Sequence, residues 1–495
     1  MATTQEIRVR PLGAATQGED QVFQLSDLDH LMPKLYVHMI EIFEQPESVD
    51  KSVIVANLVK GLERALADYP ILTGTLHFDN KARRIVVKKQ PGSSLTLSIK
   101  EADDSDIPPF AVLDKHDFPV HLLDSPKVLP PLFVAEHWNP IPSNDISSDG
   151  PAVAGAQVTF IKGGLIIGLA IPHQVCDGPA FEALLTAWAR YASAATRGED
   201  LNQLPDTSSE IPGRGVLTAK SKPILSAEEL QKLSEKFPTM KMRDGPPAPP
   251  PADFKMPVVK TRIWHFPKSK LQQLKAQCSA GLEPGTWIST YDAILAMMWR
   301  ATVRAKSPLL KPDPNAPSKA VHAVNGRGRA DPPISERYIG TAITMPQSKE
   351  LTVADVLGDL EITLPVLARA VRASTASVTP EYLNDLVKYA AGSHDLRWTE
   401  LDMHWVLGLD CMAFDWHTMK SYRDHNFGFG GPAALRWPHP GFEGFFFVLP
   451  TRANVRNAGP DEGIEVCFGL EENCYAELEK DEEFARYAEQ RGLGI

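Results

Sequence analysis

The stretch Gly155–Tyr191, GAQVTFIKGGLIIGLAIPHQVCDGPAFEALLTAWARY, is the most informative about the fold, because it combines signals for two strands, a loop and a helix. Two apolar runs, AQVTFI and LIIGLAI, flank the turn at Gly163–Gly164, which predicts a β-hairpin whose second strand is buried on both faces. After the loop, apolar residues recur at helical spacing, and Asp177 or Gly178 suits the N-cap of that helix. The pattern therefore predicts that His173 lies in a loop between a buried strand and a helix.

The rest of the chain mixes both kinds of element. Apolar patterning predicts strands in Leu25–Phe43 and Val258–Phe266, and helices in Ser52–Tyr69 and Thr290–Lys306. The stretch Ala320–Ile334, AVHAVNGRGRADPPI, reads as a strand that runs into an arginine-bearing turn. This mixed order fits an α/β or α+β class better than a barrel or a helix bundle.

The length of 495 residues predicts two domains, because single cores stop growing well below that size. The segment GPPAPPPADFKMP is too rich in proline to join the centre of a sheet. We therefore expect an N-terminal domain over 1–205, a proline-rich linker over 206–257 and a C-terminal domain over 258–495.

Composition excludes several classes of function. A net charge of −11 opposes binding to nucleic acid or to an anionic membrane. The five cysteines lack metal-ligand spacing and read as free thiols in a reducing compartment. The N-terminal sequence does not fit a signal peptide, and the longest apolar run is too short to cross a bilayer, so the default is a cytoplasmic protein. Phosphate-loop, dinucleotide-binding, HExxH and GxSxG motifs are not present in the sequence.

The loop HQVCDG leaves two interpretations of His173 open. A neutral imidazole at the end of a rigid strand can accept a proton from a substrate hydroxyl, because its pKa lies near neutral pH. The spacing to Asp177 alone is weak, and a loop histidine without a catalytic role is the commoner case. Asp177 suits an ion pair or backbone hydrogen bonds that fix the loop, and Gly178 permits a sharp turn. Cys176 is more simply a packed apolar residue than a nucleophile.

Several segments in a fixed order resemble one enzyme family. His173–Gly178 matches the HxxxDG motif of the BAHD acyltransferases, which are CoA-dependent and related to chloramphenicol and carnitine acyltransferases. LSDLDHLMPKLYVHMIEIF, LVKGLERALADYPILTGTL, WISTYDAILAMMWRATVRA and VNGRGRADPPISERYIGTAI resemble further blocks of that family, and HNFGFGGPAALRWP corresponds to its DFGWG signature. The C-terminal stretch is similar to fungal members. The resemblance covers nearly the whole chain.

The resemblance implies an α/β fold of two similar-sized chloramphenicol-acetyltransferase-like domains, each a mixed sheet flanked by helices, with a channel between them. It implies an acyltransferase for groups other than amino-acyl groups, with acyl-CoA, most simply acetyl-CoA, as co-substrate and a hydroxylated secondary metabolite as acceptor. His173 would be the general base for direct transfer, without an acyl-enzyme and without a metal, and its imidazole would also protonate the CoA thiolate. Asp177 would pair with an arginine such as Arg327 or Arg329. The expected state is a cytoplasmic monomer.

The second signature departs from the family pattern. Asn426 stands in place of the aspartate, and Phe429 stands in place of the tryptophan, so the indole N–H donor is lost. Gly428 and Gly430 are retained as part of the structural motif. If the family's tryptophan helps to hold the oxyanion, another donor must replace it. The candidates for that role are backbone N–H groups of this segment and the hydroxyls of Ser289 or Thr290. Phe429 is a candidate for a contact with the substrate.

Basic residues at the start of the second half are candidates for contacts with CoA: Lys260, Arg262, Lys268, Lys270 and Arg304. For each of them a solvated surface position explains the charge equally well. Two other functions stay open. One is a condensation-type enzyme that uses a carrier-protein thioester, although Pro172 stands where such domains carry a first histidine. The other is a binding protein that has lost activity.

Overall fold

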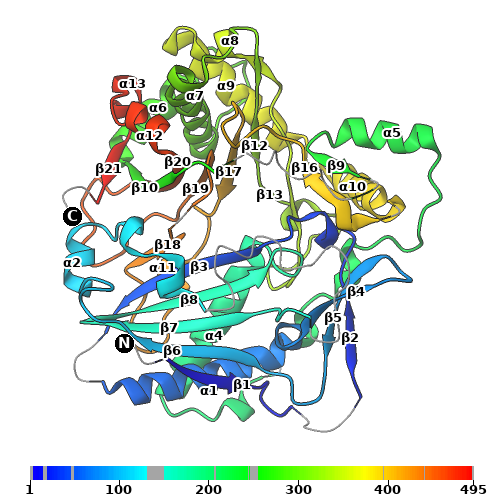
Figure 1. The fold of residues 1–495 in the computed structure, drawn as a ribbon, viewed down its shortest axis with the longest axis vertical. Helices are drawn as coiled ribbons and strands as arrows, with labels where there is room; N and C mark the ends of the chain where they lie inside the picture. The colour runs from blue at the N-terminus through cyan, green and yellow to red at the C-terminus, as the bar shows by residue number, and fades with distance from the viewer. Residues whose placement is uncertain are drawn as a thin grey trace.

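The computed structural model describes residues 4–492 except 15–18, 46–48, 131–149, 206–207, 244, 246–254, 394 and 440. Within these residues the chain forms two six-stranded mixed sheets, which confirms the predicted mixed α/β class. Figure 1 shows the N-terminal sheet, coloured blue to cyan, in the lower half of the view and the C-terminal sheet above it.

The N-terminal sheet has the strand order β1-β6-β7-β8-β3-β18. Strands β6 and β7 pair in parallel and the other neighbours are antiparallel. The predicted hairpin is confirmed as β7 and β8, both buried along their whole length. The strands are β1 (Thr4–Val9), β3 (Tyr36–Glu44), β6 (Leu95–Glu101), β7 (Gly155–Ile161), β8 (Gly164–Pro172) and β18 (Ala434–Arg436).

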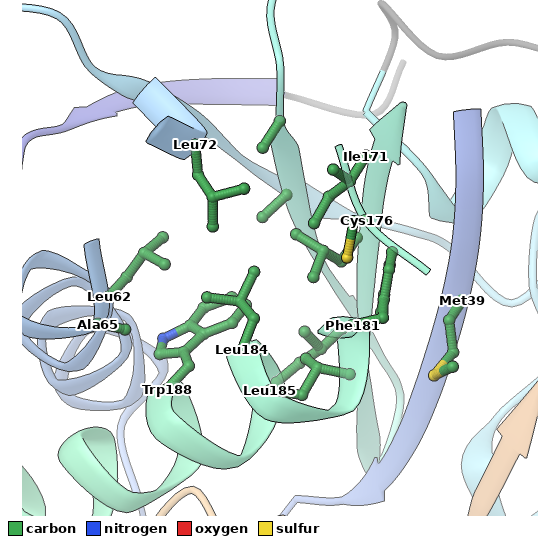
Figure 2. Close-up of a cluster of buried hydrophobic side chains, with 14 of the residues drawn as sticks. Met39, Leu62, Ala65, Leu72, Ile171, Cys176, Phe181, Leu184, Leu185 and Trp188 are labelled. Carbon is green, nitrogen blue, oxygen red and sulfur yellow. The ribbon is translucent and has the colours of Figure 1, made fainter. Parts of the chain in front are cut away.

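Two long helices cover one face of this sheet, α1 (Lys51–Asp68) and α4 (Gly178–Thr196), as the periodicity predicts. Figure 2 shows Phe181, Leu184 and Trp188 of α4 pointing toward Leu62 of α1 and Ile171 of β8. The opposite face is covered by α2 (Phe110–Lys115) and α3 (Ser125–Val128) with a separate apolar cluster. Burial on both faces explains why β8 is a continuous apolar run rather than an alternating one.

The C-terminal sheet has the order β12-β17-β19-β20-β10-β21, and its two pairs at the β12 edge are parallel. The predicted helix from Thr290 is α7 (Thr290–Leu310), which is buried between this sheet and α9. The strands are β10 (Val259–Phe266), β12 (Ala320–His322), β17 (Cys411–Asp415), β19 (Phe445–Val448), β20 (Ile464–Glu471) and β21 (Glu489–Arg491). The flanking helices are α6 (Lys268–Cys278), α8 (Val353–Leu357), α9 (Leu360–Ala376), α12 (Glu472–Leu478) and α13 (Glu482–Ala485).

Two features of the structure complicate the predicted division into an N-terminal domain over 1–205 and a C-terminal domain over 258–495. Strand β18, late in the chain, pairs with β3 of the N-terminal sheet, so the second half completes the first sheet. The segment expected to be a linker contains α5 (Ala227–Lys236), which begins with a capping box, and β9 (Met240–Met242), which pairs with β16 (Thr399–Leu401). Phe237 is buried there against Tyr382. Much of the expected linker is therefore packed on the C-terminal half, while the exact domain boundaries stay a prediction.

Shorter elements fill the spaces around the two sheets. A three-stranded sheet consists of β2 (Gln21–Gln24), β4 (Thr75–Asp79) and β5 (Arg84–Lys89). Two short pairs are β11 (Pro317–Ser318) with β15 (Leu351–Thr352), and β13 (Val324–Asn325) with β14 (Ile343–Thr344). Helices α10 (Pro380–Gly392) and α11 (Ser421–Asp424) complete the fold. Among the helices of the described ranges, none is long and apolar enough to cross a membrane.

Candidate active site

His173 is the first residue after β8, and the sheet fixes its backbone. The register of β3 and β8 ends with Tyr36 opposite Pro172. The next backbone N–H, that of His173, donates to the carbonyl of Leu35 at 2.8 Å, and the Thr341 hydroxyl donates to the His173 carbonyl at 3.1 Å. The histidine backbone is therefore held by both halves of the molecule.

The His173 side chain borders a cavity of about 680 Å³. The side chain is otherwise buried, and burial lowers the pKa of its imidazole below the ordinary value of 6.5 because the charged form loses hydration. Its Nδ1 atom is buried and has no hydrogen-bond partner among the described residues, which leaves Nε2 as the nitrogen available to a ligand. His173 can therefore act as a neutral base at physiological pH.

Asp177 fixes the loop through the arginine pair that the sequence predicted, and Arg327 rather than Arg329 is the partner. The Arg327 guanidinium donates two hydrogen bonds of 2.8 Å to the two carboxylate oxygens, and both side chains are fully buried. The carboxylate also accepts backbone N–H bonds from Ala180, at the start of α4, and from Ala342. Arg329 instead donates to two carbonyls at the end of α9. The Asp177 carboxylate is thus engaged by Arg327 and by backbone N–H groups, and it serves the geometry of the loop.

A second buried ion pair, which the sequence reasoning missed, supports the same loop. Asp29 accepts hydrogen bonds from Arg214 and from the Thr341 backbone N–H, and Arg214 also donates to the Val175 carbonyl at 2.8 Å. These residues lie far apart in the sequence, and the family-like blocks that contain Asp29 and Thr341 do not indicate that they meet Arg214. Only the folded chain brings them together beneath the loop.

The cavity receives residues from both halves of the chain. Leu35, Val37, His173 and Gly178 come from the N-terminal half. The C-terminal half supplies an aromatic wall, which we define as Phe414, Trp416, Trp437, Phe442, Phe445 and Phe447. Its rings contact one another, with Trp437 stacked on Phe447 at 4.3 Å. The cavity therefore combines a polar base with a large apolar surface, as ligand pockets commonly do.

Trp416 lies next to the histidine loop and was not predicted from the sequence. A Cβ atom added to Gly178 would lie 3.0 Å from the Trp416 Nε1 atom, so the glycine is needed for this close approach. The indole N–H has no hydrogen-bond partner among the described residues. The wall thus places a donor group beside the loop that carries His173.

Comparisons with known proteins agree with this geometry. The profile described as Transferase family matches residues 135–485, and the Trichothecene 3-O-acetyltransferase-like N-terminal domain matches residues 35–189. The chain belongs to the Transferase family. The resemblance to BAHD acyltransferases is thereby confirmed, and the protein is an acyltransferase.

Relatives and solved structures cover nearly the whole acyltransferase. Acetyltransferase FGR3 of Gibberella zeae is 27% identical, over 98% of this chain and 94% of the relative. Acyltransferase easC of Emericella nidulans is 25% identical, over 95% of each chain. The crystal structure of Fusarium sporotrichioides TRI101 complexed with coenzyme A and T-2 superposes with a TM-score of 0.75 at 21% identity, over 95% of this chain and 99% of that one. This similarity shows that the two chains share a fold.

The acyltransferase keeps Ser289 and Thr290 at the cavity, where the sequence reasoning expected polar substrate contacts. Ser289 is the N-cap of α7 and forms a capping box with Asp292. Its hydroxyl group donates a hydrogen bond of 2.7 Å to the Asp292 carboxylate. For the Thr290 hydroxyl, a hydrogen bond of this kind is not found among the described residues. Their roles toward a substrate stay predictions.

The NFGFG segment lies outside the residues that line the cavity. Phe429 packs edge-on against Phe43 of β3 at 5.4 Å, and Gly428 and Gly430 adopt φ angles of 100° and 119°, which favour glycine. Asn426 is exposed, and its amide oxygen accepts from the N–H groups of both glycines. The prediction that Phe429 or these N–H groups contact the reacting atoms has no support in this geometry, while the structural part of the motif is in place.

The cations proposed for CoA do not line the cavity either. Arg304 is paired with Asp481 at 2.7 Å and with Glu483 at 3.3 Å, and Lys270 is paired with Glu489 at 2.6 Å. Lys260, Arg262 and Lys268 also lie outside the lining. The cations that do line it are Lys275, Arg329 and Arg372. The basic stretch Pro267–Gly281 contains Lys275, whereas no signal in the sequence distinguishes Arg372.

Cysteine-based and metal-based catalysis have little support in the described residues. All five cysteines are free and buried, and burial raises the pKa of the Cys176 thiol well above its ordinary value of 9.0. Cys176 does not line the cavity and is packed in the apolar core, as Figure 2 shows. In the described part of the chain, groups of three or more residues able to hold a metal ion are not found.

Proposed function

We propose that this acyltransferase moves an acyl group, most simply acetyl, from acyl-CoA to a hydroxyl of a small, largely apolar secondary metabolite. The observation that carries the proposal is the neutral His173 imidazole at the wall of a cavity shared by both halves of the chain. The coenzyme A and toxin in the TRI101 crystal structures support the donor and the class of acceptor. The aromatic wall supports an acceptor with few polar groups.

In the proposed reaction, Nε2 of His173 takes the hydroxyl proton while that oxygen attacks the thioester carbonyl. The negative charge that develops on the carbonyl oxygen needs a fixed donor. We assign this role to the indole N–H of Trp416, which lies beside Gly178 and replaces the donor lost at Phe429. Collapse of the tetrahedral intermediate forms the ester and releases CoA. Cys176 is buried outside the cavity, which supports direct transfer without an acyl-enzyme.

The phosphates of CoA would meet Lys275 and Arg372 in place of the residues first proposed. Lys275 is exposed on α6 and lines the cavity, so its ammonium can reach solvent-exposed phosphates. Arg372 lies over the ring of the half-exposed Trp287 at 4.1 Å and is anchored to Asp292 at 2.9 Å. A monomeric, cytoplasmic enzyme stays the simplest expectation for the whole protein.

The test combines thiol release with mass spectrometry of products. Purified protein is incubated with acetyl-, malonyl- or longer acyl-CoA and a panel of apolar alcohols. We expect free CoA thiol and an acylated product, and His173→Ala should lower the rate by about 10²–10⁴-fold without a change in the circular dichroism spectrum. His439→Ala, outside the cavity, is the control. Undiminished turnover by His173→Ala, or no thiol release from any donor by the wild type, would overturn the proposal.

A further inference from the structure

A second histidine with a carboxylate partner borders the same cavity. His417 follows β17, and its Nδ1 atom is hydrogen-bonded to the carboxylate of Asp415. The Asp415 carboxylate also accepts the His417 backbone N–H at 3.1 Å. Because Nδ1 is taken, the free nitrogen of this imidazole is Nε2, which has no partner in the described part of the chain. Asp415 and His417 both line the cavity.

The position of His417 in the wall follows from its neighbours in the chain. Trp416, one residue earlier, contacts the loop of His173 through Gly178, and Thr418, one residue later, also lines the cavity. The His417 ring stacks on Tyr291 of α7, with centroids 6.1 Å apart and planes 10° apart. One short segment therefore presents an indole N–H at the histidine loop and an imidazole at the first turn of α7. Both imidazoles therefore line the same cavity.

The charges around His417 favour its protonated form. Burial alone would lower the pKa of His417, but the hydrogen bond and charge of Asp415 raise it overall above the ordinary value of 6.5. Tyr291 faces the ring from α7, and His322 of β12 lies behind Tyr291 at 5.8 Å. The cations Arg329 and Arg372 also line the cavity. The His417 side chain is 31% exposed, so it can exchange protons with solvent.

We propose that His417 is a second catalytic residue of this acyltransferase, a general acid that protonates the sulfur of CoA as the carbon–sulfur bond breaks. The step rests on the proposed function. His173 takes the proton from the acceptor hydroxyl, the electron pair of the breaking C–S bond goes to sulfur, and the Nε2 proton of His417 completes the thiol. His173 then loses its proton, and His417 regains one from solvent, so the cycle balances.

This division of labour follows the environments of the two imidazoles. His173 is buried without a carboxylate partner at its ring and stays neutral, as a base requires. His417 is held by Asp415, which favours its protonated form, as an acid requires. Pairs of groups whose environments separate their pKa values in this way identify acid and base roles. In this proposal His417 supplies the second proton, whereas the family resemblance implies that His173 handles both.

The experiment measures the pH dependence of kcat/KM with acetyl-CoA and an acceptor found in the product screen. Wild-type activity should fall at low pH, where His173 becomes protonated, and at high pH, where His417 loses its proton. His417→Phe keeps the stack on Tyr291, and His417→Gln keeps a polar side chain, but neither can donate a titrating proton. Both should lose the high-pH limb and about 10²-fold in kcat/KM near neutral pH, at the low end for acid–base groups because a thiolate leaves readily.

Asp415→Asn separates catalysis from packing. It retains a hydrogen-bond partner for His417 but removes the charge, so the high-pH limb should move to lower pH. His439→Phe is the matched control, because His439 pairs with Asp124 at 3.1 Å outside the cavity, and its pH profile should match the wild type. A high-pH limb that persists in both His417 variants, or does not move in Asp415→Asn, would overturn the proposal. Absence of thiol release by the wild type would instead overturn the proposed function.

Discussion

The loop His173–Gly178 and the segment Asn426–Gly430 correspond to the two signatures of the family, yet the structure uses them differently. The loop borders the cavity and is fixed by two fully buried carboxylates, Asp177 and Asp29. The NFGFG segment lies outside the cavity, and an exposed amide oxygen holds its turn. The first signature places His173 at the cavity, whereas the second forms a packing contact on the N-terminal sheet.

The surroundings of the two positions explain why an aspartate is present in the first signature and an asparagine suffices in the second. Asp177 faces a buried guanidinium, and an uncompensated charge in such a place is costly. Asn426 faces only backbone N–H groups, which need a hydrogen-bond acceptor rather than a charge. The need for a carboxylate at each position therefore depends on whether its partner is a buried charge.

Removing the carboxylate of the first signature should have the largest effect. Asp177→Asn keeps a cap for α4 but leaves Arg327 buried without its counter-ion, so we expect a loss of about 3–5 kcal/mol in the free energy of unfolding. Asn426→Asp, the reverse change in the second signature, should stay within about 0.5 kcal/mol. Urea denaturation measures both. Equal effects of the two substitutions would contradict the comparison.

Removing the donor beside the loop should affect turnover more than folding. Trp416→Phe keeps an aromatic ring but loses the indole N–H, so kcat should fall by about 10²–10³-fold if no other donor replaces it. Trp405→Phe is the control, because Trp405 packs behind Phe445 and does not line the cavity. Steady-state kinetics of both variants show whether turnover depends on the Trp416 indole N–H in particular. A loss confined to KM would argue against the assignment of Trp416 to the oxyanion.

His173 in the first signature and His425 next to the second should change the free energy of unfolding in opposite directions as pH changes. Burial alone would lower the pKa of His425, but Glu41, 2.6 Å away, raises it overall above 6.5. Its pairing therefore stabilises the fold below pH 6.5, and that contribution is lost as pH rises through the folded-state pKa. His173, whose pKa is lowered, disfavours the folded state as pH falls below 6.5. The gap in unfolding free energy between wild type and His425→Gln should shrink from pH 6 to pH 9.

Restoring the family's tryptophan should have the smallest effect. Phe429→Trp adds an indole next to Phe43, outside the cavity, so kcat should stay close to that of the wild type. The larger ring must fit beside Phe427 and Phe43, and we expect a stability change of about 1–3 kcal/mol at most. Kinetics and thermal denaturation measure the two quantities. A marked rise in kcat would mean that the segment reaches the reacting atoms after all.

Much of the fold could be predicted from the sequence because its signals are local. The β7–β8 hairpin, α1, α4 and α7 follow from the period of their apolar residues and from turn or cap residues within a few positions. The resemblance identified the family and pointed to His173. Residues 206–257 were harder, because their prolines mask a capped helix, α5, whose place depends on contacts with the C-terminal half.

The amino-acid sequence was enough to predict the main elements, the family and a histidine at the cavity. The packed chain was needed to show that Arg327 rather than Arg329 meets Asp177, that the NFGFG segment lies away from the cavity, and that Trp416 and His417 line it. Distance along the chain explains this limit. Periodicity and capping act over a few residues, whereas Asp177 and Arg327 are 150 positions apart and meet only when the core packs.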